Sequence, residues 1–249
     1  MTETDTPLAV IADIHGNADA LHAVLADIAR RGITRIVALG DHLSGPLAAR
    51  EVAEVLMASD ILCIRGNHDR YLTDLAPGDM GPSDRVAYDQ LEAHHLDWLR
   101  SLPPNCHMGE VFLCHGTPDS DRIYWLDKLG PSAEAQLRPR AEIAALATVD
   151  APLCLCAHTH IPRRVTLPDG RTILNPGSVG CPGYDDDTPV PHVIEAGTPE
   201  ACYATVQRTP AGWASSHHHV PYDASRMVGM ARAHARQTWV RAVGTGWLR

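Results

Sequence analysis

Five short polar motifs in this 249-residue chain carry side chains that commonly bind metal ions in proteins. In chain order they are Asp13-Ile14-His15, Gly40-Asp41-His42, Gly66-Asn67-His68-Asp69, His115-Gly116 and His158-Thr159-His160. Each motif follows a short apolar run of the kind that forms a buried β-strand. An isolated Asp-x-His or Gly-Asp is typical of a turn or a helix cap. Five such motifs at five successive predicted strand ends indicate instead that their side chains share one site.

The residue types in these motifs favour metal ions of intermediate hardness. Imidazoles, carboxylates and one amide oxygen, without a thiolate, suit manganese, iron or zinc. Ser120 and Ser178 have no base with an orienting group in the sequence, which disfavours a serine nucleophile.

Alternating strands and helices in the N-terminal half position these motifs. Apolar runs predict strands at 8–12, 35–39, 61–64, 111–114 and 153–157. Helical periodicity and composition predict helices from Leu21 to Gly32 and at 48–57, 84–101 and 132–147. This order predicts parallel strands joined by right-handed crossovers, so that loops at the carboxyl ends of the strands can converge.

The C-terminal half contains short strands instead, followed by a basic segment. Strands are predicted at 163–167, 171–174, 192–195 and 201–206, with a hairpin turn at 168–170. No acidic residue occurs after Asp223, whereas this segment contains Arg226, Arg232, Arg236, Arg241 and Arg249. We expect a basic helix near 223–243 that docks on the body of the protein, with an anion-binding or partner-binding tail as the alternative.

The order of the five motifs resembles that of the calcineurin-like metallophosphoesterase superfamily, over residues 8 to about 195. A later stretch, residues 175–180 (Asn-Pro-Gly-Ser-Val-Gly), is similar to the YfcE-like bacterial and archaeal phosphodiesterase branch. The resemblance implies an α/β fold, a four-layer αββα sandwich of two mixed β-sheets flanked by helices. We expect a single domain over residues 1–249, with helical insertions near 70–105 and 118–148.

The resemblance also implies two metal ions at the sheet edge. Two such ions roughly 3.5–4 Å apart lower the pKa of a bridging water to near 7 and neutralise the oxygens of a phosphoryl group. We therefore expect hydrolysis of phosphate esters by in-line attack of a metal-bridging hydroxide, without a covalent enzyme intermediate.

A role for each motif residue is implied as well. By motif position, Asp13, His15 and His160 would hold one metal ion. Asn67, His115 and His158 would hold a second ion, and the carboxylate of Asp41 would bridge the two. His68 would lie outside the metal ligands, facing the substrate. There it would stabilise the charge on the leaving oxygen or protonate it.

One position departs from the branch pattern, and several other residues have competing interpretations. Related proteins carry a basic residue soon after the Asn-Pro-Gly-Ser stretch, whereas this chain has Cys181-Pro182-Gly183. Candidate replacements as a phosphate-binding group are Arg65 and the pair Arg163–Arg164. His42 either lines the substrate cleft or is a surface residue or a support behind the ligands. Asn17 is either a helix N-cap or a phosphate contact, and Asp69 is expected to cap or charge a helix start.

Three further groups of polar residues also need an interpretation. His94 and His95 lie in a predicted helix remote from the motifs, so we expect no catalytic role. At most two of the three residues 217–219 can face one site on a strand, and no carboxylate flanks them, so we expect no metal site there. The triplet 185–187 is either a solvated turn or a contact for the substrate or a third cation.

Charge and composition exclude several classes of protein. Thirty acidic against 21 basic residues give a net charge of −9, which disfavours binding to duplex nucleic acid. An aromatic content of 5% also argues against a single-strand binding track. No apolar run approaches the ~18 residues of a membrane helix, and we expect neither a signal peptide nor a membrane partner. Seven cysteines without a C-x-x-C pair favour free thiols and a cytoplasmic location.

Two alternatives to a small-substrate phosphoesterase were weighed. One is a phosphatase for proteins or dinucleotide polyphosphates, for which the insertions near 70–105 and 118–148 would have to shape a groove. The other is a non-catalytic binding scaffold of the same fold. Loss of chemistry normally removes several ligands, whereas all seven ligand positions and His68 are present here. The sequence therefore favours an enzyme acting on small phosphodiesters or monoesters; it predicts no oligomeric state.

Overall fold

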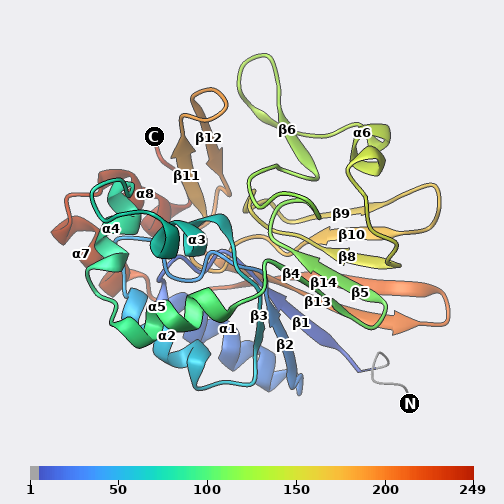
Figure 1. Ribbon diagram of the computed structural model, residues 1–249, viewed down its shortest axis with the longest axis horizontal. Helices are drawn as coiled ribbons and strands as arrows, with labels where there is room; N and C mark the ends of the chain where they lie inside the picture. The colour runs from blue at the N-terminus through green and yellow to red at the C-terminus, as the bar shows by residue number, and fades with distance from the viewer. Residues whose placement is uncertain (1–5) are drawn as a thin grey trace.

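Two five-stranded mixed sheets form the centre of the computed structural model, which describes residues 6–249 (Figure 1). The first sheet contains β1 (Leu8–Ile11), β2 (Arg35–Ala38), β3 (Leu62–Cys63), β13 (Ala201–Thr209) and β14 (Gly212–Val220), in the order β14-β13-β1-β2-β3. The second contains β4 (Asn105–Met108), β5 (Val111–Cys114), β8 (Leu153–Leu155), β9 (Arg163–Thr166) and β10 (Thr172–Asn175), in the order β4-β5-β8-β10-β9. The expected α/β fold with two mixed sheets is confirmed.

Each sheet contains a set of adjacent parallel strands, and the polar motifs follow the carboxyl ends of strands in these sets. In the first sheet β1, β2 and β3 are parallel, and β13 runs antiparallel to β1. In the second sheet β5, β8 and β10 are parallel, with antiparallel β4 and β9 at the edges. Because both sheets contribute, the motifs meet where the carboxyl ends of two sheets come together.

Successive side chains along each strand point to opposite faces of the sheet, so the apolar residues belong to separate cores. On β1, Leu8 and Val10 pack between the two sheets, whereas Ala9 and Ile11 pack against the helices. In the second sheet Leu113 and Leu155 face the first sheet, and Phe112 and Cys154 face outward. The sheets therefore share one buried apolar layer, and burial of this layer fixes the register of the strands.

Seven helices cover the outer face of the first sheet. They are α1 (Ala18–Arg30), α2 (Ala49–Met57), α3 (Asn67–Asp74), α4 (Pro82–Tyr88), α5 (Ala93–Ser101), α7 (Ser225–Ala233) and α8 (Gln237–Thr245). Asn17 is the N-cap of α1, where its side chain accepts a hydrogen bond from the backbone N–H of Ala20, at 3.1 Å. The N-cap interpretation of Asn17 is therefore confirmed. None of the helices in residues 6–249 is both long and apolar enough to span a membrane.

The layer outside the second sheet is thinner than expected. It contains α6 (Arg140–Ala145) and the 118–130 segment, with Trp125 and Leu126 packed on Phe112. The expected helix at 132–147 is wrong, because β7 (Ala135–Leu137) pairs with β6 (Asp127–Leu129) and α6 begins only after Pro139. The insertion near 118–148 is thus mainly a hairpin and loops, whereas the 70–105 insertion is helical as expected.

Three other boundaries differ from the sequence predictions. Residues 84–101 form parts of two helices, α4 and α5, and the expected helix at 223–243 is likewise two helices, α7 and α8. Between these last two, Ala235 adopts a left-handed φ of 55°, which no continuous α-helix accommodates. Asp185 and Asp186 belong to β11 (Gly183–Asp186), which pairs with β12 (His192–Glu195), so the acidic triplet is not simply a loop.

Candidate metal centre

The seven predicted ligands lie together at the carboxyl ends of the parallel strands. Asp13, His15 and His160 present donor atoms that all lie within 4.8 Å of one another. A second such group consists of Asp41, His115 and His158. These six residues come from both sheets, and five of them are buried, with His158 intermediate.

Asp41 lies between the two groups. Its Oδ2 atom is 3.3 Å from His115 Nε2 and 3.8 Å from His15 Nε2. Asn67 extends the second group, because its Oδ1 atom lies 3.1 Å from His115 Nε2. The geometry therefore brings all seven side chains into two adjacent sets, and Asp41 lies close to a histidine of each.

The backbone at this site is strained. Seven non-glycine residues in the described chain have positive φ, and five of them are predicted ligands: Asp13, His15, Asp41, His158 and His160, at 51–72°. Such conformations cost about 1–3 kcal/mol each and persist only where the surroundings impose them. Here the loops hold one another: Asp13 N–H donates to Gly40 O at 3.1 Å, and His15 N–H donates to Asp41 O at 3.0 Å.

Carbonyl groups orient three of the imidazoles. The Nδ1 atoms of His15, His115 and His160 lie 2.8, 2.7 and 2.7 Å from the carbonyl oxygens of Ser44, Leu39 and Cys181. A carbonyl oxygen only accepts, so each Nδ1 must carry the proton and donate it. In the neutral imidazole this leaves the Nε2 lone pair free and directed into the site, the usual arrangement of a metal-binding histidine.

Two of these lone pairs point at each other. His15 Nε2 and His160 Nε2 are 3.3 Å apart, and neither can donate to the other while both imidazoles are neutral with Nδ1 protonated. Asp13 Oδ1 is buried without a hydrogen-bond partner among residues 6–249, and it lies 3.5 Å from His160 Nε2. Three hydrogen-bond acceptors therefore face one another in a buried site. A cation between them would bind all three lone pairs, so these atoms are suited to a metal ion.

Burial and mutual charge set the protonation of the site. Burial raises the pKa of Asp13 well above its usual value, despite the opposing effect of His115. Burial acts in the same direction at Asp41, but the charges of His115 and His68 outweigh it and hold the pKa of Asp41 well below its usual range. Without cations, it is therefore easier for one of the two carboxylates to be ionised than for both to be ionised at once.

The histidines also differ in pKa. Burial lowers the pKa of His158 to about 3 and that of His160 well below its usual value, so both are neutral and available as ligands. At His115 burial acts in the same direction, but the Asp41 carboxylate dominates and raises the pKa to about 10. A proton on His115 and a metal ion therefore compete for the same lone pair.

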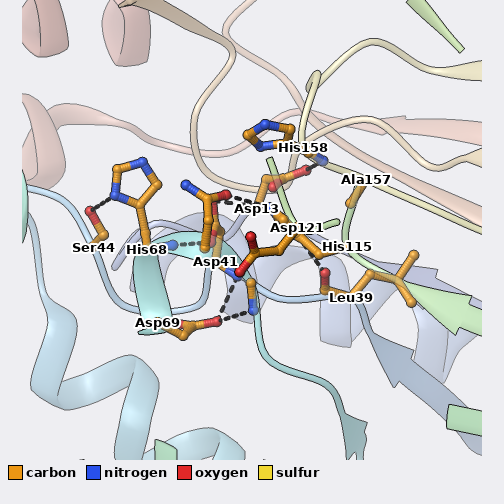
Figure 2. Close-up of polar contacts among 12 residues, drawn as sticks. Asp13, Leu39, Asp41, Ser44, His68, Asp69, His115, Asp121, Ala157 and His158 are labelled. Atoms are coloured by element: carbon orange, nitrogen blue, oxygen red, sulfur yellow. Dashed lines mark hydrogen bonds and ion pairs between the residues drawn. The ribbon is translucent and has the colours of Figure 1, made fainter. Parts of the chain in front are cut away.

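His68 lies next to the two ligand groups and is held by three contacts. Its backbone N–H donates to Asp41 Oδ1 at 2.9 Å, and Ser44 Oγ lies 3.3 Å from His68 Nδ1 (Figure 2). The same Nδ1 lies 2.8 Å from Asp84 Oδ1, on α4 of the helical insertion. Burial opposes the charged form of His68, but Asp41 and Asp84 outweigh it and raise the pKa to about 9. Asp84 belongs to no motif and was missed in the sequence.

Asp69 does more than charge the start of a helix. Its carboxylate accepts hydrogen bonds from the backbone N–H groups of Asp41, His42 and Gly66 at 2.8, 3.0 and 3.0 Å. The expected capping role is confirmed, and the same carboxylate also fixes the loop that presents Asp41. Gly66 is required here, because a Cβ atom at this position would collide with the Asp41 side chain and backbone.

Several other candidates lie outside the site. His42 is fully buried and donates from Nε2 to Ile64 O at 2.9 Å, so the cleft-lining interpretation is wrong. His95 is buried and accepts from the backbone N–H of Glu92, in agreement with a structural role. The residues 217–219 belong to no metal-type group in the described chain.

The arginines considered as phosphate-binding groups are engaged elsewhere or lie away from the site. Arg163 binds Asp127 through two hydrogen bonds of 2.8 and 3.0 Å, and Arg164 donates to Trp213 O at 2.8 Å. Arg65 does not line the cavity described next. The sequence candidates therefore supply no anion-binding arginine.

A cavity of about 1090 Å³ opens over the ligands. His68 lines it, as do the aromatic residues Tyr71, Tyr124, Tyr184 and Trp239. Residues 185–187 line it as well, which agrees with the substrate-facing alternative for this acidic triplet. Its arginine and lysine residues are Arg122, Lys128, Arg138 and Arg236, of which only Arg236 belongs to a segment considered for anion binding from the sequence. The space accommodates a small substrate with polar groups on several sides.

This combination of two facing mixed sheets and a buried His/Asp/Asn cluster defines a metal-dependent phosphoesterase fold. Residues 7–196 match the calcineurin-like phosphoesterase superfamily domain, so the chain belongs to that superfamily. The family expectation from the motifs is thus confirmed, and the chain is a metal-dependent phosphoesterase.

Individual relatives agree with this assignment. The uncharacterized protein MJ0912 of Methanocaldococcus jannaschii is 28% identical over 205 residues, which cover 70% of this chain and 76% of that protein. A metallophosphoesterase from Sphaerobacter thermophilus is 27% identical, with a TM-score of 0.73 and coverage of 97% and 99% of the two chains. Protein PH1004 of Pyrococcus horikoshii shares the fold, at 19% identity, TM-score 0.74 and coverage of 98% and 100%. YfcE of E. coli also matches, at 22% identity over 80% of this chain, but its TM-score of 0.41 adds no argument for the YfcE-like branch.

Proposed function

We propose that this protein is a binuclear metal-dependent hydrolase of small phosphate esters, either monoesters or diesters. The observation that carries the proposal is the set of facing acceptors, His15 Nε2, His160 Nε2 and Asp13 Oδ1, next to a second group that shares Asp41. Without cations these buried atoms repel one another. With two cations every one of them has a partner.

Each ligand has a proposed place. Asp13, His15 and His160 hold one ion, and Asn67, His115 and His158 hold the other. Asp41 bridges them, which agrees with its position between His15 and His115. When bound, manganese, iron or zinc ions would supply an ionised water as nucleophile and neutralise the phosphoryl oxygens.

His68 has the geometry of a general acid for the leaving oxygen. Its Nδ1 proton is bound by Asp84, which leaves Nε2 as the ring nitrogen available to the substrate. The side chain is about one-third exposed to the cavity, and its pKa of about 9 keeps it protonated at neutral pH. Asp84 is a positioning residue, because it fixes the ring orientation and favours the charged form.

Substrate size and location follow from other features. The cavity of about 1090 Å³ fits a small molecule, and the net charge of −9 disfavours a polyanion. We place the protein in the cytoplasm, because all seven cysteines are free.

The test measures metal content and turnover together. Purified protein is stripped with a chelator, reloaded with Mn²⁺, Zn²⁺, Ni²⁺ or Mg²⁺, and assayed on p-nitrophenyl phosphate and bis(p-nitrophenyl) phosphate. We expect two ions per chain and hydrolysis of at least one ester only in the reloaded protein. One ion per chain at saturation would contradict the binuclear centre, and no turnover with any metal would favour a binding scaffold.

A further inference from the structure

The C-terminal helices contribute to the cavity although they lie beyond the family domain. The match to the superfamily ends at residue 196, whereas Arg236 and Trp239 line the same cavity as the ligands. Arg236 is the N-cap residue of α8, directly after the left-handed Ala235 that separates α7 from α8. The break in the C-terminal helix thus places two side chains, three residues apart, at the metal centre.

Trp239 anchors this end of α8 against the ligand loop. Its indole lies edge-on to the His15 ring, with centroids 6.0 Å apart. Gly45 lies beneath it, because a Cβ atom on Gly45 would come within 3.2 Å of the indole and collide with the backbone of His15. The start of α8 is therefore packed tightly on the loop that presents a metal ligand, and the position of Arg236 is well defined.

Arg236 lies on the His68 side of the cavity. Its guanidinium donates to Ser83 Oγ at 3.3 Å, and the next residue, Asp84, binds His68. Within residues 6–249 this guanidinium has no carboxylate partner, in contrast to two other cavity cations, Lys128 and Arg138, which both pair with Glu142. One half-buried arginine with most of its donors free therefore lies next to the proposed general acid.

We propose that Arg236 binds a negatively charged group on the leaving part of the substrate. This inference rests on the proposed function, in which His68 protonates the leaving oxygen. The leaving part then extends from His68 toward Ser83 and Arg236. The substrate class is a phosphate ester whose leaving alcohol carries a carboxylate or a further phosphate.

The chemistry of the guanidinium suits this role. It offers two parallel N–H donors to a carboxylate or phosphate, and such charge-assisted bonds are stronger than neutral ones. Asp185, Asp186 and Asp187 also line the cavity, and an anion close to them is repelled. An anionic leaving group is therefore favoured next to Arg236 and disfavoured on the β11 side.

The test compares two esters that differ in one charge. These are 3-carboxyphenyl phosphate and 3-carbamoylphenyl phosphate, hydrolysed by the metal-loaded full-length protein at neutral pH. We expect kcat/KM of the wild type to be about 10-fold higher for the carboxylate ester, the order of one charge-assisted hydrogen bond. Arg236→Gln should remove this preference by lowering kcat/KM for the carboxylate ester more than for the carbamoyl ester, whereas Arg236→Lys should retain part of it.

Arg232→Gln provides the matched control. Arg232 is exposed on α7 and does not line the cavity, so this variant makes the same change in net charge without touching the site. We expect it to keep the wild-type preference, which separates local binding from long-range attraction.

The outcomes distinguish this inference from the function on which it rests. If Arg236→Gln lowers kcat/KM for both esters equally, or if the wild type shows no preference, Arg236 does not bind the leaving group, although the phosphoesterase activity stands. If the reloaded wild type hydrolyses neither ester, both the proposed function and this inference are overturned.

Discussion

Histidines are concentrated in two regions of this protein, and only one of them has the geometry of a metal site. In the metal centre, His15, His115, His158 and His160 come from loops after strands of both sheets. In the second region, His217, His218 and His219 are consecutive on β14. The residue type is the same, so the difference must come from the backbone that presents it.

The partners of the rings show this difference. In the metal centre, three Nδ1 atoms donate to carbonyl groups and the Nε2 atoms converge near Asp13 and Asp41. On β14, His217 donates to Asn175 O at 2.8 Å, and His218 makes a 2.9 Å hydrogen bond with Thr205 Oγ1. Successive strand residues point to opposite faces, so these rings each find a separate partner. The geometry of a metal site therefore depends on loops that converge with strained φ angles, and not on the number of histidines.

Asp41→Asn is expected to have the largest effect of any variant on the difference between the two histidine regions. It keeps the side-chain volume but removes the charge that both ligand groups share. We expect both ions to be lost or greatly weakened together, with loss of nearly all metal-dependent hydrolysis, as measured by metal analysis and the nitrophenyl assays. Loss of one ion while the other stays at full occupancy would contradict the bridging position.

His68→Ala tests whether one histidine at the centre acts without holding metal. We expect the variant to retain both ions while its rate falls by ~10²–10⁴, the range of a lost acid–base group. Metal content and kcat are measured on the same sample. If both ions are lost as well, His68 is a structural part of the metal site and the general-acid role is wrong.

Asp84→Asn is expected to have a smaller effect, about 10- to 100-fold in rate, as for other residues that orient a functional side chain. Removing the Asp84 charge lowers the pKa of His68 from about 9, so the protonated form is lost at lower pH. The alkaline limb of the kcat/KM profile should therefore move to lower pH. An unchanged profile would show that Asp84 does not control His68.

The same variant can be tested in the metal-free protein, through the pH dependence of its free energy of unfolding. The raised pKa of His68 stabilises the fold fully below the unfolded value of 6.5, and this contribution is lost as pH rises through about 9. Denaturant unfolding between pH 6 and pH 10 should therefore show a smaller loss of stability in Asp84→Asn than in the wild type.

The smallest effects are expected on β14. His217→Asn and His218→Ala should leave metal content and kcat within about twofold of the wild type, because neither ring contacts the ligand groups. Stability should change by no more than about 1 kcal/mol, as for partly exposed positions. A drop in metal stoichiometry in either variant would mean that β14 takes part in metal binding.

Much of the site was predictable because its residues follow apolar strands directly. The runs before Asp13, Asp41 and His115 are short and buried, and parallel strands bring their ends together. Asp84 was not predictable, since it reaches His68 from a helix with no motif and its role exists only in the packed structure. The left-handed φ angles of Asp13 and His158 were not predictable either, because they depend on hydrogen bonds between loops.

The errors in secondary structure have similar causes. Residues 132–147 have a helical composition, but β7 gains hydrogen bonds from β6 that composition does not show, and Pro139 delays the helix. The break at Ala235 leaves no signal either, because alanine is the strongest helix former. Both differences affect the cavity, since Lys128, Leu129 and Arg138 of the first region and Arg236 of the second line it.

Anomalous diffraction from a crystal grown with Mn²⁺ tests the central claim most directly. We expect two peaks roughly 3.5–4 Å apart, one among Asp13, His15 and His160 and the other among Asn67, His115 and His158. An oxygen of Asp41 should lie within bonding distance of both. A single peak, or two peaks with Asp41 bound to only one, would contradict the account.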